Sequence, residues 1–411
     1  MNKKIASLFL AMLVGTMSMT SVYAKTIKAP AEAKKPTAEV SAPKDAAVIE
    51  NGYLFLKDEY PTGKDVVPYK QALDEAIKNN SSLAALEDSV RVVDQTITLN
   101  NDSFMLSASS GISTPQVISI LTTLKSMQNN QETKPLTETM LKDSTESMLL
   151  TTITGIESQK IDLQVLEENI ALSEENIKNL ELQKKAGVVS ENSLKLAKIS
   201  LDSSKANRDS LKLSLDSKHT ALDALLGKSL TNKIQVEYRP NESKIDTARL
   251  EATLNDAVDN SPTVKAKVIA LRGAKYDKDI TTYDTPSIYN PTGMTVQQIE
   301  LNQIQLENAV KDADRDLKDT RSSTEQGVRN LIDNVKQLEA ARVSLDVALE
   351  TAKNAYDTAL LNYKAGNIIK YQVDQARIGV LKAESDIEKN KISYDQLRFL
   401  AEKPYLAAMT K

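Results

Sequence analysis

The residue types that carry out nucleophilic or metal chemistry are scarce in this chain. Its 411 residues include no cysteine and a single histidine, His219. A zinc site of Cys and His ligands, or a Cys/His nucleophile, needs several such groups in one chain. His219 lies one position from a residue of an apolar heptad pattern, which favours a helix-surface or rim histidine over a base or ligand.

Carboxylate pairs are the remaining candidates for acid–base chemistry. Glu167-Glu168 and Glu174-Glu175 recur at a spacing typical of a solvated helix face, and no pocket-forming segment surrounds them. The chain also contains no glycine-rich phosphate-binding loop. The sequence therefore predicts that the protein is not an enzyme, with no cofactor and no metal site.

Composition and charge indicate long helices rather than a sheet-rich core. Glycine and proline number 12 each, aromatic residues make up 4% of the chain, and tryptophan is absent. Charge is balanced, with 52 Lys and Arg against 56 Asp and Glu, so nothing predicts a nucleic-acid partner.

A helical hairpin around Gly366 is the clearest local pattern. Apolar positions alternate steps of three and four before and after this glycine, as in a coiled coil. Glycine tolerates positive φ and is the natural end for the first arm. The positions before it are Leu331, Val335, Leu338, Arg342, Leu345, Leu349, Ala352, Tyr356, Ala359 and Tyr363, and those after it include Val373, Ala376, Val380, Ala383 and Ile387.

The same hairpin occurs earlier in the chain. Lys185-Ala-Gly-Val-Val-Ser190 matches Lys364-Ala-Gly-Asn-Ile-Ile369, again between heptad patterns. Upstream, the segment Leu73–Leu83 matches Leu254–Val264. Three segments recur in order at a nearly constant offset, so the sequence predicts an internal duplication of about 180 residues.

The N-terminal region has the features of an exported protein. Residues 1–24 show a basic start, a short apolar core and small residues before a cleavage site after Ala24, typical of a signal peptide rather than a membrane anchor. Residues 25–50 are rich in Lys, Ala and Pro and predict a disordered tether. Residues 51–67 are strand-like at 51–58, and we expect them to lie near a second strand at 233–239, within the inter-repeat linker 228–245.

The two repeats, 68–227 and 246–402, each predict a short helix, a long helix and an outgoing helix, followed by a tail at 403–411. The first repeat predicts helices at 68–99 and 114–186, with Pro135 expected to kink or break the second. The second repeat predicts helices at 246–281 and 295–365. Each outgoing helix has about 36 residues, so two short helices placed end to end would match one long helix in a rod.

Several of these motifs resemble the TolC family of outer-membrane efflux channel proteins, over residues 68 to 402. The resemblance rests first on the Leu-x-x-Ala-x-x-x-Asn motif that opens each repeat, at Leu73, Ala76 and Asn80 and again at Leu254, Ala257 and Ser261. It rests also on the Tyr-x-x-Gly hairpin at Tyr363 and Gly366. The resemblance implies a homotrimer whose twelve-stranded helical barrel forms a tunnel, working with an adaptor (membrane fusion) protein and an inner-membrane exporter. It also implies that the glycine turns lie at the tunnel tip.

The resemblance assigns roles to residues of the two turns. The adaptor-docking residues would be Lys185, Gly187, Val188, Val189 and Ser190, with Lys364, Gly366, Asn367, Ile368 and Ile369. The residues that close the aperture would be Ser193, Tyr363, Gln372, Asp374 and Gln375. Family members often carry acidic residues here, whereas this chain has glutamines and a serine, with Asp374 displaced by one position.

The linkers depart from the family. A membrane-spanning β-strand needs about 9–11 residues, whereas the linkers 100–114 and 282–294 are short and the second contains Pro286 and Pro291. We therefore expect an all-α rod of duplicated coiled-coil hairpins with little β-structure and no clear transmembrane β-barrel. Phe104-Met-Leu106 with Ile112 forms an apolar patch suited to peripheral contact with a membrane, the cell wall or a partner.

Three functions stay open from the residues alone. The first is a trimeric conduit of an export system in the cell envelope. The second is a non-conducting helical spacer or scaffold of the envelope. The third is the adaptor itself, which two hairpins and the near absence of β-structure disfavour.

Overall fold

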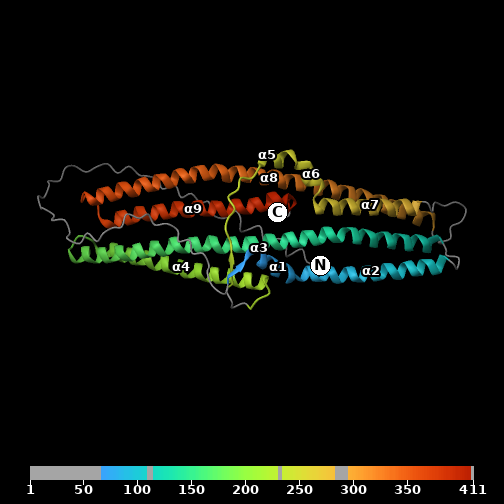
Figure 1. The fold of residues 1–411 in the computed structure, drawn as a ribbon, viewed down its shortest axis with the longest axis horizontal. Helices are drawn as coiled ribbons and strands as arrows, with labels where there is room; N and C mark the ends of the chain where they lie inside the picture. The colour runs from blue at the N-terminus through green and yellow to red at the C-terminus, as the bar shows by residue number, and fades with distance from the viewer. Residues whose placement is uncertain (1–65, 109–113, 230–233, 283–294, 409–411) are drawn as a thin grey trace.

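Long helices run side by side and make the chain an elongated rod (Figure 1). The computed structural model describes residues 66–108, 114–229, 234–282 and 295–408. Two helices run nearly its full length: α3 (Thr114–Lys185) has 72 residues and α8 (Val296–Lys364) has 69. At 1.5 Å per residue each is about 105 Å long. Among the helices of these ranges, none combines the length and apolar character needed to cross a membrane.

The shorter helices form two broken rows beside the long ones (Figure 1). Along α3 lie α1 (Tyr69–Lys78), α2 (Ser81–Ala108) and α4 (Glu191–Leu225). Along α8 lie α5 (Thr247–Ala252), α6 (Leu254–Asp259), α7 (Pro262–Thr282) and α9 (Lys370–Glu402). One half of the rod therefore has the order α4, α3, α9, α8, and the other half has α2, α3, α7, α8. This arrangement confirms the predicted all-α fold of duplicated hairpins.

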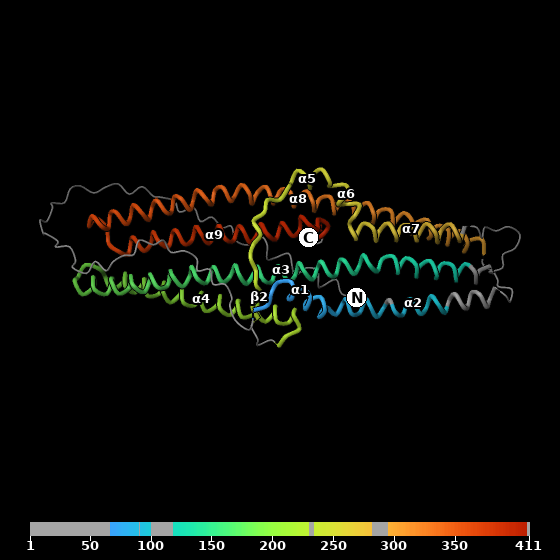
Figure 2. Tube along the Cα trace, viewed as in Figure 1, coloured from blue at the N-terminus to red at the C-terminus, as the bar shows by residue number. Residues whose placement is uncertain are grey.

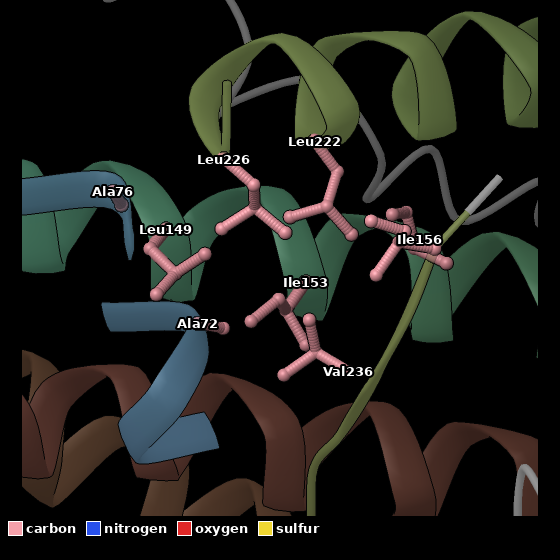
Figure 3. Packing of buried hydrophobic residues seen from close by; sticks show 9 residues of the cluster. Ala72, Ala76, Leu149, Ile153, Ile156, Leu222, Leu226 and Val236 are labelled. Atoms are coloured by element: carbon pink, nitrogen blue, oxygen red, sulfur yellow. The ribbon is translucent and has the colours of Figure 1, made fainter. Parts of the chain in front are cut away.

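The largest cluster of buried apolar residues in the described part of the chain lies near the middle of the rod, where α1, α4 and a short strand meet on α3 (Figure 3). Its buried residues are Ala72, Ala76, Leu149, Ile153, Ile156, Leu222, Leu226, Ile234 and Val236. The ends of the short helices thus bury apolar side chains together, which stabilises the junction by the hydrophobic effect.

A two-stranded parallel sheet closes this junction. The strand β1 (Val66–Pro68) pairs with β2 (Gln235–Glu237), and Val67 lies opposite Val236. A strand within 233–239 was expected, but its observed partner is residues 66–68. The strand expected at 51–58, the tether and the signal peptide lie outside the described residues.

His219 is buried at this junction, so the expected surface or rim position is wrong. Its Nδ1 lies 3.3 Å from Ile234 O, and because a carbonyl oxygen only accepts, Nδ1–H donates. One turn further along α4, Asp223 Oδ1 accepts from Ile234 N at 3.0 Å. The pair therefore fixes the backbone at the start of β2, a structural role that the heptad pattern does not reveal.

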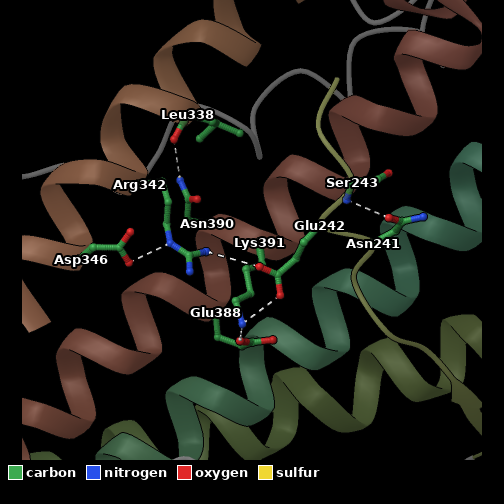
Figure 4. Close-up of polar contacts among 9 residues, drawn as sticks. All are labelled: Asn241, Glu242, Ser243, Leu338, Arg342, Asp346, Glu388, Asn390 and Lys391. Carbon is green, nitrogen blue, oxygen red and sulfur yellow. Dashed lines mark hydrogen bonds and ion pairs between the residues drawn. The ribbon is translucent and has the colours of Figure 1, made fainter. Parts of the chain in front are cut away.

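The segment after β2 crosses from the first repeat to the second (Figure 2). Tyr238 donates to Asp395 Oδ2 on α9 at 2.8 Å. Glu242 then contacts Lys391 of α9 at 3.1 Å and Arg342 of α8 at 3.8 Å (Figure 4). The crossover is thus tied to both helices of the second hairpin by charged and polar contacts.

The predicted helices at 68–99 and 246–281 are both interrupted. The first breaks at Asn79 and Asn80, where Asn80 Oδ1 accepts from Ser82 N at 2.9 Å and so begins α2. The second breaks first at Thr253, between α5 and α6, and again at Asn260, before Pro262 begins α7. The helix α2 also continues to Ala108, beyond the expected end at Leu99.

Pro135 does not break α3, so that part of the prediction is wrong. A proline removes one backbone hydrogen bond and costs about 3 kcal/mol in a helix interior. In this region α3 is packed between α2 and α7. Packing along a helix of this length offsets a local cost of that size.

Beyond α9, the short 3₁₀-helix η1 (Pro404–Ala408) folds back onto the rod. Its Tyr405 and Leu406 are buried with Leu150 of α3 and Phe399 of α9. Lys403 Nζ lies 2.7 Å from Asp143 Oδ1 of α3, and Lys403 also contacts Glu146. The described end of the chain is therefore packed against the middle of the rod.

Candidate functional site

The turn between α3 and α4, residues 186–190 (turn 1), is closed by a Schellman motif. Val188 N donates to Gln183 O at 2.9 Å and Gly187 N donates to Lys184 O at 2.9 Å. The motif needs a left-handed residue between helix and loop, and Gly187 has φ of 74°. This geometry explains why glycine stands at this position.

The turn between α8 and α9, residues 365–369 (turn 2), repeats the motif. Asn367 N donates to Asn362 O and Gly366 N donates to Tyr363 O, both at 2.9 Å. Gly366 has φ of 79°. The two copies of the duplicated sequence therefore fold into the same backbone turn.

The two outgoing helices begin differently. Ser190 caps α4, since its side chain accepts from Ser193 N at 3.1 Å, and the acidic Glu191 follows. Ile369 precedes α9 and has no side-chain acceptor; instead Gln372 Oε1 accepts from Ile369 N at 3.4 Å. Turn 2 thus starts its helix with a weaker cap.

Apolar side chains stand at the surface of both turns. Val188 is 74% exposed and Ile369 is also exposed. Val189 and Ile368 are half-buried, and Ile368 packs against the core of its own hairpin. Of the predicted docking residues, Lys185, Gly187, Ser190, Lys364, Gly366 and Asn367 are exposed. The turns therefore present a mixed basic and apolar surface.

The predicted aperture residues differ in their exposure. Ser193 is exposed on α4 and Gln372 and Gln375 are exposed on α9. Tyr363 instead packs into the hairpin core. Asp374 is largely covered and lies 3.5 Å from Lys370 Nζ.

A charged contact that the sequence analysis missed joins the two hairpins near their turns. Lys370 Nζ, in the first residue of α9, lies 2.9 Å from Glu175 Oε1 on α3. The hydrogen bond that Lys370 donates to Glu175 raises the pKa of Lys370. Partial burial opposes this rise, and the charge of Asp374 adds to it. A lysine beside a helix N-terminus is disfavoured by the helix dipole, and these carboxylates offset that effect. The sequence signal is the unusual lysine at that position, but its partner on α3 is set by tertiary packing.

This contact also shows that the turns are staggered along the rod. Beyond Glu175, α3 continues for ten residues to Lys185 before turn 1, whereas turn 2 lies directly before Lys370. Turn 1 accordingly reaches further than turn 2 at the end of the rod (Figures 1 and 2).

Comparison with known proteins gives a match in structure alone. No protein-family model and no curated protein sequence matches the chain. Solved structures similar to it include the CmeC outer membrane channel of Campylobacter jejuni, with 14% identity and a TM-score of 0.65 over 83% of this chain and 86% of that one. The outer membrane protein VceC of Vibrio cholerae matches with 11% identity and a TM-score of 0.63 over 83% of this chain and 96% of that one.

The MtrE outer membrane channel of Neisseria gonorrhoeae, in its open state, is similar at 13% identity and a TM-score of 0.52, over 88% of this chain and 96% of that one. At such identities the likeness establishes the fold. The chain therefore has the helical fold of TolC-like outer-membrane channels, as the sequence motifs predicted.

Proposed function

We propose that this chain is a subunit of a TolC-like export conduit in the cell envelope. Three copies form the helical tunnel, the two glycine turns dock an adaptor protein, and the adaptor connects the tunnel to an inner-membrane exporter. The observation that carries this proposal is the fold likeness to channel proteins, which extends over more than four fifths of this chain. Those structures are described as channels or membrane proteins and not as enzymes, which agrees with the scarcity of catalytic residue types.

The order of the helices supports the trimer. Near the turns, each chain contributes four neighbouring helices, with α4 and α8 at the two edges. Three such units supply the twelve helical strands that the family resemblance implies. A closed ring also gives both edge helices a partner, which an isolated chain does not.

The chemistry of the turns supports docking. Val188 and Ile369 are exposed apolar residues at a helical tip, beside Lys185 and Lys364. Apolar side chains rimmed by charged ones are typical of protein–protein contact sites. Export of the chain, cleavage after Ala24 and peripheral contact with a membrane or the cell wall belong to the same proposal; the signal peptide and Ile112 lie outside the described residues.

Dye accumulation in cells tests the proposal. Cells lacking the chain should retain more ethidium than the parent, and the wild-type chain should restore efflux. The double variant Val188→Asp/Ile369→Asp should fail to restore it at equal protein level, because charged side chains at the turns disrupt an apolar contact. The matched control is Val92→Asp, which should restore efflux. Val92 lies on α2 toward the other end of the rod, and its exposed fraction of 60% lies between those of Val188 and Ile369.

Unchanged ethidium retention in cells lacking the chain, together with an altered spacing of envelope layers in electron micrographs, would contradict the conduit. That outcome would favour the non-conducting spacer. Restoration by the turn variant would contradict docking through the turns.

A further inference from the structure

Two edge helices carry exposed apolar residues at the same spacing. On α4, Ile199 is 54% exposed and Leu213 is 71% exposed. On α8, Val347 is 62% exposed and Leu361 is 67% exposed. Both pairs are separated by 14 residues, which is four turns of a coiled-coil helix and about 21 Å. The two helices run in opposite directions, so a single antiparallel placement of α4 against α8 sets Leu213 opposite Val347 and Ile199 opposite Leu361 at the same time.

The residues between these positions are small. At three- and four-residue steps between Ile199 and Leu213, α4 exposes Ser203, Ala206 and Ser210. Between Val347 and Leu361, α8 exposes Thr351, Ala355 and Thr358. Small side chains permit close approach of two helices, whereas the large apolar residues at either end gain by leaving water. Each helix thus has a second heptad face, opposite the one that packs within its own hairpin.

The charges next to these faces are complementary in the same placement. Asp209 is followed three residues later by Lys212 on α4, and Glu350 is followed three residues later by Lys353 on α8. When the helices run antiparallel with Leu213 opposite Val347, Asp209 lies beside Lys353 and Lys212 lies beside Glu350. Within one chain Asp209 also contacts Arg208, and Lys353 is half-buried. Such surface pairs add little affinity, but they penalise a shifted register in which like charges meet.

Within one chain, the positions of these residues along the rod axis agree with that register. On α4, Lys212 contacts Glu167 of α3 at 2.7 Å. Asp162 of α3 contacts Lys389 of α9, and the neighbouring Asn390 donates to Leu338 O of α8 at 3.2 Å. Glu167 lies five residues nearer the turns than Asp162. Lys212 is therefore level with a point about five residues past Leu338, which is about four residues, or about 6 Å, short of Val347.

Rotation about an axis parallel to the rod leaves the height of every residue unchanged. Copies related by such a rotation therefore meet with α4 and α8 in the register of a single chain. We propose that α4 of one copy packs against α8 of the next, with Leu213 opposite Val347 and Ile199 opposite Leu361. This inference rests on the proposed trimer and names the surface that closes it.

The absence of cysteine in the native chain allows a direct test by disulfide cross-linking. The matched pairs are Leu213→Cys with Val347→Cys, and Ile199→Cys with Leu361→Cys, each in the full chain produced and oxidised in cells. Both should give covalent trimers on a denaturing gel, because each copy supplies one cysteine to each neighbour. Facing positions of packed helices approach within the Cα separation of a disulfide, about 4.4–6.8 Å.

The control pairs use the same four cysteines in crossed combinations. Leu213→Cys with Leu361→Cys, and Ile199→Cys with Val347→Cys, place the sulfurs about 21 Å apart in the proposed register and should not cross-link. Equal cross-linking of matched and crossed pairs would overturn the register. Failure of the matched pairs in a chain that is trimeric by light scattering would overturn this surface while the proposed function stands. Cross-linked products that contain another protein in place of a second copy of this chain would also overturn the proposed contact between α4 and α8.

Discussion

The side chain of Asn79, in the residue after α1, caps the far end of α4. Its Nδ2 donates to Ala224 O at 3.0 Å and to Leu225 O at 3.3 Å. The last carbonyl groups of a helix have no i+4 partner within the helix. Asn79 donates to two of them, and Ala224 O also accepts from Gly227 N at 3.1 Å. This contact joins α1 and α4 end to end into one continuous row along α3.

Replacing Asn79 should therefore weaken the middle of the rod. We expect Asn79→Ala to lower the free energy of unfolding by about 1 kcal/mol, the typical net value of a hydrogen bond. Urea denaturation at fixed protein concentration measures this change in the free energy of unfolding. The control Asn207→Ala changes an exposed asparagine within α4 and should stay within about 0.5 kcal/mol of the wild type. Equal effects of the two substitutions would contradict the capping role.

The glycines of the two turns should be intolerant of a side chain for a backbone reason alone. A Cβ at Gly187 or Gly366 would meet nothing within 4 Å, but both residues have positive φ. We expect Gly187→Ala and Gly366→Ala each to cost about 1 kcal/mol. Gly379 is the matched control, because a Cβ there also meets nothing and its helical backbone suits alanine. Gly379→Ala should stabilise the chain by about 0.5–1 kcal/mol. The opposite order of unfolding midpoints would contradict the Schellman geometry.

Gly327 on α8 should hold the C-terminal 3₁₀-helix in place by having no side chain. A Cβ at Gly327 would lie 2.7 Å from the backbone N of Ala408 and 2.8 Å from its Cα. Gly327→Ala should therefore displace η1 and expose residues 404–408 to carboxypeptidase digestion, followed by mass spectrometry. Gly273→Ala is the control, because a Cβ there meets the side chain of Asn129, which is able to move. Equal protection of the C-terminus in both variants would contradict this contact.

The phenol of Tyr238 should make stability fall at high pH. Burial, and then the charge of Asp395, raise the pKa of Tyr238 above its ordinary value. An unfolded tyrosine ionises near pH 10. Because the folded pKa is the higher one, the stabilisation is fully present below about pH 10 and is lost as the pH rises through the folded pKa.

The variant Tyr238→Phe isolates this effect. It should be about 1 kcal/mol less stable than the wild type at pH 8, because the hydrogen bond to Asp395 is lost. Between pH 10 and 11 its unfolding midpoint should fall less steeply than that of the wild type. Tyr69 and Tyr405, whose pKa values are also raised by burial, are common to both proteins. Parallel pH profiles would contradict the assignment.

The features that depend on local spacing could be predicted from the sequence. Heptad periodicity located the two long helices, and the glycines at 187 and 366 located the turns, because a single residue type satisfies positive φ at low cost. The duplicated motifs also predicted the order of helices in each repeat. These are properties that a short stretch of chain determines by itself.

The features that the sequence left undetermined depend on contacts between distant segments. His219 is buried because α4 meets β2 there, and no pattern within α4 indicates this contact. Pro135 is tolerated because α3 is packed on two sides, whereas its local effect predicts a break. The links Lys370–Glu175 and Lys403–Asp143 join residues on different hairpins, so their pairing follows from how α3 and α9 lie together.

The breaks at Asn79–Asn80 and Asn260–Ser261 did have a local signal. Asparagine and serine cap helices, and Pro262 suits the first position of a new one. The helices predicted at 68–99 and 246–281 nevertheless ran through these residues without a break. The structure shows that the capping residues determine the outcome there.

Light scattering of the chain purified from the cell envelope tests the central claim most directly. The measurement should be made over a range of concentrations, because assembly follows mass action. A self-assembled conduit predicts a mass of three chains that persists on dilution. A mass of one chain at every concentration would contradict it.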